Sequence, residues 1–266
     1  MTEDPTKPEL LPDGLPTTNA PKGPITLAID IGGTGLKAGL LDATGQLVGE
    51  RARVETPKPS TPEAVVPHLV GLGQKLAGFD RVSVGFPGVV QKGVVKTAPN
   101  LGTKAWASFA LAATLETHLS RPVRMLNDAT VQGLGVIAGQ GLECVITLGT
   151  GFGFALYLDG QLAPHLEMSQ HAIRHGETYD EYVGVAALKR VGKRRWRKRV
   201  ERVLDQLRVV INFDTMYVGG GDARLIDFKL PADIKIVSND AGITGGVKLW
   251  SPALDDAFKP IKGALA

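Results

Sequence analysis

The chain has 266 residues, of which 43% are hydrophobic and 21% charged, a composition typical of a soluble globular protein with a substantial core. Its net charge of +3 does not indicate a protein built as a whole to hold nucleic acid, and its single cysteine, Cys144, excludes an internal disulfide and a thiolate zinc cluster. No apolar run reaches the roughly 20 residues of a membrane helix. Residues 1–23 are rich in proline and lack an apolar signal core, so we expect a disordered tail and a cytoplasmic protein.

The first half of the chain alternates apolar runs with turns. Strands are predicted over 25–30, 37–41 and 46–54, and the first two enclose the turn Ile31-Gly32-Gly33-Thr34-Gly35. A helix is predicted over 62–76, with Thr61 as its cap, and a strand over 81–86. A helix over 107–119 and a strand over 122–126 complete this half.

The second half opens in the same way. A helix is predicted over 127–138, and strands over 144–148 and 154–158 enclose a second turn, Gly149-Thr150-Gly151-Phe152-Gly153. Helices over 181–190 and 193–210 and strands over 215–218 and 234–238 follow, with no strand predicted between residues 162 and 216. The repeated strand, glycine turn and strand predict an α/β protein of two related halves around a central cleft, with a boundary near residues 127–140.

Both glycine-rich turns have the composition of phosphate-binding loops. Backbone N–H groups can converge on an anion where side chains do not block the approach. Lys37 adds positive charge near the first turn, and Asp30 is placed to hold a hydrated Mg²⁺ ion. A tight hairpin also needs glycine for its positive φ angles, so each turn alone is weak evidence. Neither turn is a P-loop, and neither fits a dinucleotide-binding turn, because strands rather than helices follow.

Asp128 is the candidate catalytic base. Phosphoryl transfer to an alcohol needs a held phosphate, a positioned hydroxyl and a group that takes its proton. Asp128 follows a predicted strand and begins a helix, whose N-terminus would favour the ionised carboxylate that a base requires. The alternative is that Asp128 only caps the helix.

Several short motifs resemble those of one superfamily. Asp30-Ile31-Gly32-Gly33-Thr34, Leu148-Gly149-Thr150-Gly151-Phe152-Gly153 and Val218-Gly219-Gly220-Gly221 resemble the two phosphate motifs and the adenosine motif of the hexokinase/actin superfamily. Gly85-Phe86-Pro87-Gly88 and Leu126-Asn127-Asp128-Ala129 are similar to segments of the ROK family of sugar kinases. The stretches 178–184 and 237–246 more narrowly resemble polyphosphate glucokinases and glucomannokinases. The resemblance covers roughly residues 24 to 250.

This resemblance implies an actin-like (ribonuclease H-like) fold with a smaller N-terminal domain, 24–128, and a larger C-terminal domain, 129–266. It implies a kinase that uses polyphosphate or ATP, with Mg²⁺, to phosphorylate the 6-hydroxyl of glucose, and mannose is the second sugar to consider. Zinc is not expected, because the chain lacks the zinc loop of other members. The resemblance also implies a homodimer. The residues implied in phosphate or nucleotide binding are Asp30, Gly32, Gly33, Thr34, Lys37, Gly149, Thr150, Gly151, Gly219, Gly220 and Gly221.

The resemblance also assigns the sugar end. Asp128 becomes the base, and Asn127 and Glu167 become sugar contacts, with Asn100 as a further polar candidate in a turn. The family's Glu-x-Gly-His segment reads Glu167-Met168-Ser169-Gln170-His171 here, so the histidine falls on Gln170, with His171 one step later. Gln170 can still donate to or accept from a hydroxyl, so we expect altered sugar identity or rate but the same reaction. A further acidic ligand is Asp180 or Glu181, which the register does not separate; Glu181 is taken as the candidate.

Nine of the 30 basic residues lie in the fourteen positions from Lys189 to Arg202. Their mutual repulsion is costly for a helix unless an anion binds it. Three interpretations compete: a solvated helix face, a polyphosphate track made by Lys193, Arg194, Arg195, Arg197 and Lys198, and a grip on a nucleic-acid backbone assisted by Trp196. The track favours polyphosphate as donor, whereas Gly219-Gly220-Gly221 keeps ATP open.

The rival hypothesis is a sugar-sensing regulatory protein of the ROK type that binds glucose with little or no turnover. Gln170 in place of the family histidine favours it. The segment before Ile25 counts against it, because it is too short and too rich in proline for a helix-turn-helix. We expect a kinase whose partners are glucose and the phosphate donor, and neither nucleic acid nor a membrane.

Overall fold

The computed structural model describes residues 23–238 and 241–259. Residues 1–22 of the expected tail lie outside these ranges, as do Asn239 and Asp240 of the second narrow resemblance and residues 260–266 of the expected C-terminal domain. Within the described ranges, no helix is both long and apolar enough to cross a bilayer.

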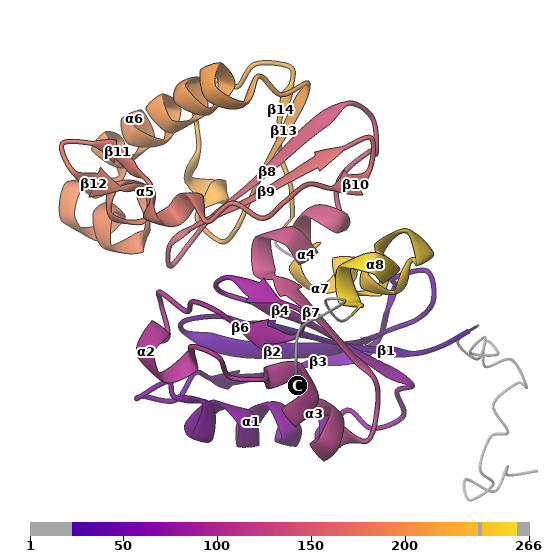
Figure 1. Ribbon diagram of the computed structural model, residues 1–266. Helices are drawn as coiled ribbons and strands as arrows, with labels where there is room; N and C mark the ends of the chain where they lie inside the picture. Colours follow the sequence, from indigo (N-terminus) through magenta and orange to yellow (C-terminus); the bar gives the residue numbers. More distant parts are fainter. Residues whose placement is uncertain (1–22, 239–240, 260–266) are drawn as a thin grey trace, which may run out of the picture.

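The first sheet has the strand order β3-β2-β1-β4-β7. β1 (Thr26–Ile31), β2 (Gly35–Leu41) and β3 (Leu47–Glu55) pair antiparallel, whereas β4 (Arg81–Phe86) and β7 (Val123–Asn127) continue from β1 in parallel. The helices α1 (Pro62–Lys75) and α3 (Leu111–Leu119) cover one face of this sheet (Figure 1). Between the sheet and these helices lies a core of aliphatic side chains around the fully buried Trp106.

The second sheet repeats the first. Its order is β10-β9-β8-β13-β14, in which β10 (Gln161–Leu162), β9 (Phe152–Leu158) and β8 (Leu142–Leu148) pair antiparallel and β13 (Thr215–Gly219) and β14 (Ile234–Ile236) follow in parallel. The helices α5 (Tyr179–Val183) and α6 (Val185–Ile211) pack on one face around the buried Trp196. The prediction of two related halves is confirmed, because the β1–β2 and β8–β9 hairpins hold matching places in the two sheets.

The helix α4 (Asp128–Leu134) begins where β7 ends and lies between the two sheets (Figure 1). The hydroxyl of Tyr157 on β9 donates to the carbonyl of Thr130 on α4 at 2.6 Å, and Val131 and Leu134 pack against the second sheet. The start of this helix is therefore fixed to both halves of the molecule.

The last described elements return to the first sheet. These are α7 (Ala241–Thr244), the 3₁₀ helices η3 (Gly245–Trp250) and η4 (Pro252–Leu254), and α8 (Asp255–Phe258). The hydroxyl of Ser83 on β4 donates to the carbonyl of Gly246 at 2.7 Å and accepts from the indole of Trp250 at 2.9 Å. These elements cover the face that α1 and α3 leave open. The division into 24–128 and 129–266 stays a proposal, although α7 and η3 of the second range pack on the first sheet.

Several predicted elements differ from those observed. The helix expected over 107–119 begins only at α3 (Leu111–Leu119), because Ser108 has a φ of 66°, and the short helix α2 (Thr103–Trp106) before it was not predicted. The helices expected over 181–190 and 193–210 form α5 and α6, and α6 is kinked at Gly192, where φ is 75°. The helix expected over 127–138 ends at Leu134.

Two small hairpins, one short strand and two 3₁₀ turns were not predicted, because each element has only two or three residues. They are β5 (Val90–Gln91) with β6 (Val94–Val95), β11 (Ala172–Arg174) with β12 (Glu177–Thr178), β10, η1 (Met168–Gln170) and η2 (Ala223–Leu225). Of these, η1 bears on the candidate site.

Candidate active site

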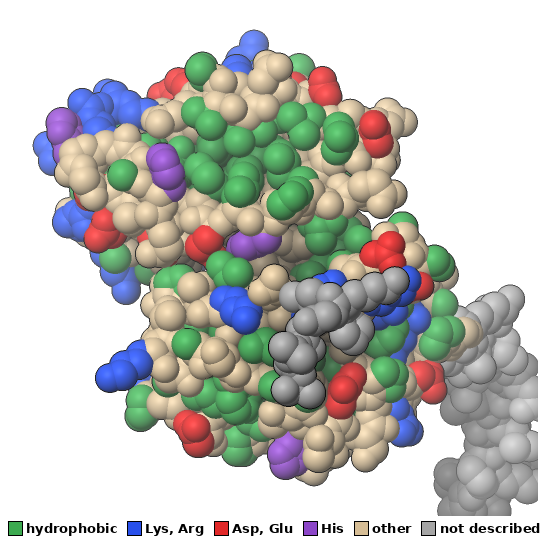
Figure 2. Space-filling model, viewed as in Figure 1, with side chains coloured by type: hydrophobic (Ala, Val, Ile, Leu, Met, Phe, Trp, Pro, Cys, Tyr) green, Lys and Arg blue, Asp and Glu red, His purple; other side chains and the backbone are tan. Residues whose placement is uncertain are grey.

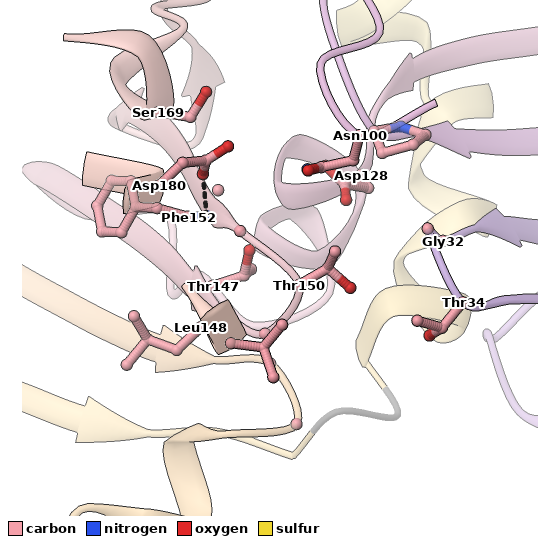
Figure 3. A pocket seen from close by; sticks show the side chains of 18 of the residues that line it. Gly32, Thr34, Asn100, Asp128, Thr147, Leu148, Thr150, Phe152, Ser169 and Asp180 are labelled. Atoms are coloured by element: carbon pink, nitrogen blue, oxygen red, sulfur yellow. Dashed lines mark hydrogen bonds between the residues drawn. The ribbon is translucent and has the colours of Figure 1, made fainter. Parts of the chain in front are cut away.

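A cavity of about 420 Å³ lies between the two sheets. The two glycine turns and the start of α4 all line it, which confirms the expected crevice (Figure 3). The sequence-predicted residues on its wall are Asp30, Gly32, Gly33, Thr34, Lys37, Asn100, Asn127, Asp128, Gly149, Thr150, Gly151, Gly153, Glu167, Gly220 and Gly221.

The two glycine turns approach each other closely. A Cβ atom on Gly33 would lie 3.2 Å from Cγ2 of Thr150, which points toward the turn of Gly32 and Thr34 in Figure 3. A Cβ atom on Gly151 would lie 2.5 Å from Oδ1 of Asp180. Side chains at these two positions would therefore close the space in which an anion could meet the backbone N–H groups.

Asn127, and not Asp128, caps α4. Its Oδ1 accepts from the backbone N–H of Thr130 at 3.2 Å, and its Nδ2 donates to the carbonyl of Gly88 at 3.2 Å. Asp128 accepts one hydrogen bond, from the N–H of Ala129 to its Oδ1 at 2.8 Å. Within the described residues its Oδ2 accepts no hydrogen bond and stays available to a ligand in the cavity.

Burial raises the pKa of Asp128 from 3.8 to about 7, and the neighbouring charges of Asp30 and Glu167 add to this effect. Burial therefore works against the expected effect of the helix N-terminus, which was to keep this carboxylate ionised. The helix has seven residues, and the loss of hydration outweighs its favourable field. A pKa close to neutral pH nevertheless suits a group that both takes and releases a proton.

Asp30 and Lys37 form an ion pair at the first glycine turn, with 3.3 Å between Nζ and Oδ2. Burial raises the pKa of Asp30, and Lys37 opposes that rise. Among the described residues no three His, Cys, Asp or Glu side chains form a cluster that could hold a metal. Asp30 fits a Mg²⁺ ion that keeps its water and binds donor phosphates, because Mg²⁺ commonly needs only one or two protein carboxylates.

Glu167 and Asp180 supply the acidic side chains of the opposite wall. Burial pushes the pKa of Glu167 up, but hydrogen bonds from His165 and Ser169 outweigh it, so that the net pKa is lowered. Asp180 accepts from the N–H of Phe152 at 2.6 Å, and burial raises its pKa to about 6. Asp180 thus ties α5 to the second glycine turn.

Three predicted sugar contacts do not reach the cavity. Glu181 is exposed, and its carboxylate accepts from the N–H of Thr178 at 2.8 Å in the capping box of α5. Of the two acidic residues that the sequence could not separate, the structure therefore places Asp180 at the cavity and Glu181 away from it. Gln170 and His171 are exposed and are not on the cavity wall.

Comparison with known proteins identifies the family. A model described as "ROK family" matches residues 26–165. Polyphosphate glucokinase of Mycobacterium tuberculosis (strain ATCC 25618 / H37Rv) is 34% identical over 233 residues, which cover 82% of this chain and 88% of the relative. The chain belongs to the ROK family.

Solved structures support the same assignment. The inorganic polyphosphate/ATP-glucomannokinase of Arthrobacter sp. strain KM superposes on this ROK chain with a TM-score of 0.78, at 33% identity, over 85% of this chain and 98% of that one. The expected actin-like fold of ROK sugar kinases is thereby confirmed. A ROK family transcriptional regulator, a homolog of the E. coli MLC protein, also matches, with a TM-score of 0.63 at 15% identity over 90% of this chain and 80% of that one. That likeness shows the fold alone.

The cavity of this ROK protein contains residues that sequence analysis missed. Gln132 lies four positions after Asp128 and hence on the same face of α4, a spacing that could have pointed to it. Ser169 replaces the glycine of the family's Glu-x-Gly-His segment, which was also a visible signal. Lys189 begins the basic segment that the sequence analysis singled out, whereas Arg53 and Asp222 carried no such signal. Gly219 ends β13 and is not on the cavity wall, unlike Gly220 and Gly221.

The basic segment of α6 divides into paired and unpaired cations. Arg197 pairs with Asp227 and donates to the carbonyl of Leu225, so it holds α6 to the following loop. The other four residues of the expected track are exposed and form no ion pair within the described chain: Lys193, Arg194, Arg195 and Lys198. Trp196 is fully buried and donates to the carbonyl of Val183 at 2.7 Å, so its expected help in gripping nucleic acid was wrong.

Proposed function

We propose that this ROK-family protein is a kinase that transfers a phosphoryl group from polyphosphate or ATP to the 6-hydroxyl of glucose, with mannose as a second acceptor. The observation that carries the proposal is the placement of Asp128, with one free carboxylate oxygen, in the same cavity as both glycine turns. The similarity to the M. tuberculosis polyphosphate glucokinase and the Arthrobacter polyphosphate/ATP-glucomannokinase supports the choice of sugar and donors.

The acceptor step follows from this geometry. As the sugar oxygen attacks the terminal phosphorus of the donor, Asp128 takes the hydroxyl proton, and the bond from that phosphorus to the bridging oxygen breaks. The products are the sugar phosphate and either ADP or a polyphosphate shortened by one unit. Asn127 holds the turn that presents Asp128, whereas Asn100, Glu167 and Asp180 offer partners to the other hydroxyls. Closure of the halves would exclude water as a competing acceptor.

The donor end is formed by backbone N–H groups and cations. Gly32, Gly33 and Thr34 face the second turn, and Lys37 and Lys189 add positive charge on the cavity wall. Asp30 would hold Mg²⁺ through water, and the bound ion would offset the charge of the donor phosphates. By family resemblance the proposal includes a cytoplasmic homodimer without nucleic-acid partners.

The preference for polyphosphate is based on α6. Basic side chains gather at the upper left of Figure 2, over the region where α6 and the β11–β12 hairpin lie in Figure 1. Lys189 lines the cavity, and beyond the kink at Gly192 the helix carries the exposed cations Lys193, Arg194 and Lys198. A long polyanion could extend from the cavity along this helix, whereas ATP has too few phosphates to leave the cavity.

Initial rates with glucose and either polyphosphate or ATP test the proposal. We expect glucose 6-phosphate with at least one donor, and a rate about 100-fold to 10,000-fold lower from Asp128→Asn. Asp205→Asn is the matched control, because Asp205 is exposed on α6 outside the cavity. Absence of product with both donors, or full activity of Asp128→Asn, would refute the assignment.

A glucose-binding regulator without turnover is the competing function, favoured by the loss of the family histidine at position 170. The fold does not separate the two functions, since a ROK transcriptional regulator shares it. A regulator has no need of a base beside two phosphate turns, which is why we prefer the kinase. Glucose binding without product, in wild type as in Asp128→Asn, is the result that a regulator predicts.

A further inference from the structure

Ser169 is a buried polar residue at the end of the cavity that holds Glu167. Its side chain is 3% exposed and lies on the cavity wall. Its Oγ donates to Oε1 of Glu167 at 2.6 Å and accepts from Nε2 of Gln170 at 3.0 Å. Oε2 of the same glutamate lies 3.4 Å from Nε2 of His165. Each oxygen of Glu167 therefore has a protein partner, and with a further contact from the backbone N–H of Ser169 the carboxylate still keeps at least one lone pair for a ligand.

The turn η1 explains why Ser169, and not Gln170, faces the cavity. In a 3₁₀ helix there are about three residues per turn, so successive side chains point roughly 120° apart. Of the three residues in η1, only Ser169 is buried, while Gln170 is exposed and its amide donates to Ser169. His171 follows the turn and is exposed beside Tyr179. Neither residue expected to replace the family histidine can contact a sugar in this cavity.

The hydrogen-bonding capacity of Ser169 is only partly used. A hydroxyl group has one hydrogen to donate and two lone pairs. The hydrogen of Ser169 goes to Glu167 and one lone pair to Gln170, which leaves one lone pair. The carboxylates of Glu167 and Asp180 can only accept while they are ionised. This end of the cavity consequently presents acceptors and selects ligand groups that donate.

We propose that Ser169 is a specificity-determining sugar contact, which accepts a hydrogen bond from one free hydroxyl of the acceptor sugar beside a second hydroxyl that donates to Glu167. Gln170 is then a positioning residue that acts through Ser169. The inference rests on the proposed function, because it names a contact within the same acceptor site. A sugar that lacks the contacted hydroxyl leaves a buried acceptor unpartnered and binds more weakly.

Calorimetric binding of glucose and of its 1-, 2- and 3-deoxy analogues tests the contact without need of turnover. We expect the wild type to bind one analogue about twofold to tenfold more weakly than glucose because of Ser169. Ser169→Ala should bind glucose more weakly by the same factor and should no longer distinguish glucose from that analogue, while it still rejects the others. Ser169→Thr keeps the hydroxyl and should keep the discrimination. His171→Ala, outside the cavity wall, should behave as the wild type.

The outcomes separate this inference from the proposed function. If Ser169→Ala discriminates among the four sugars as the wild type does, the contact is absent and the inference is wrong. If the alanine variant does not fold, Ser169→Cys, which is similar in size and a weak acceptor, provides the same comparison. Glucose binding without phosphorylation would refute the proposed kinase function. The binding data would still test the contact between Ser169 and the sugar. A wild type that binds none of the four sugars would overturn both.

Discussion

Replacing Asp128 by asparagine should stabilise the protein while it removes activity. Burial of this carboxyl raises its pKa from 3.8 to about 7, so the folded state holds a proton that the unfolded chain releases. Each pKa unit corresponds to about 1.4 kcal/mol of folding free energy. Ionisation of the buried carboxyl, with its pKa raised by about three units, therefore costs the folded state at most roughly 4 kcal/mol. Asparagine has nearly the same shape, carries no charge and can still accept from the N–H of Ala129. At pH 8 we therefore expect Asp128→Asn to be about 2–4 kcal/mol more stable than the wild type.

The stability difference between Asp128→Asn and the wild type should depend on pH. Between pH 3.8 and about 7 the native state binds more protons at Asp128 than the unfolded state, so wild-type stability falls as pH rises. The advantage of the variant should shrink by about 1.4 kcal/mol per pH unit as pH is lowered from 7 to 5. Catalysis by the wild type should fall over the same range, because a protonated Asp128 cannot take the hydroxyl proton.

We would measure urea denaturation of both proteins at pH 5, 6, 7 and 8. Initial rates would be measured at the same pH values. Asp205→Asn serves as control and should change neither stability nor rate by much, because it alters a charge in solvent. We expect kcat of Asp128→Asn to fall by about 100-fold to 10,000-fold. A variant that is less stable than the wild type, or an advantage that does not vary with pH, would show that Asp128 is not a desolvated carboxylate.

Three further predictions concern other parts of the molecule. Gln132→Met should raise the free energy of unfolding by about 1 kcal/mol in urea, because Nε2 of Gln132 is buried without a partner in the described chain; a loss of stability would contradict this. The double change Lys193→Gln and Arg194→Gln should raise KM for long polyphosphate several-fold and leave KM for ATP unchanged, and equal effects on both donors would argue against the track. Trp196→Ala should cost about 3–5 kcal/mol in thermal or urea unfolding, and a near-neutral result would mean that α6 is held by other contacts.

The two sheets could be predicted because their signals are local. Apolar runs on either side of Gly32 and Gly149 define hairpins, and the repetition of that unit indicates two related halves. The candidate base was equally accessible, since Asp128 follows a buried strand directly. These elements depend on neighbours within a few residues, which a sequence displays.

Contacts between distant segments could not be predicted in this way. Asp180 and Glu181 are adjacent in sequence, yet about 100° of helical rotation and the capping bond to Thr178 send one to the cavity and the other to solvent. The direction of Gln170 depends on a three-residue turn too short to have a periodic signal. The pKa of Asp128 depends on burial between two sheets and on Asp30, about a hundred positions away in sequence.

The return of residues 241–258 to the first sheet has a consequence for biosynthesis. Ala28 on β1 and Leu41 on β2 pack against Ile243 of α7, and Figure 1 shows α7 over the first sheet. While the ribosome still holds the last residues, this apolar face of the nascent sheet has no cover, although its opposite core can already form around Trp106. Completion of the N-terminal half should therefore wait until residues 241–258 have left the ribosome, and a nascent chain arrested before residue 240 should remain more sensitive to protease in β1 and β2 than the finished protein.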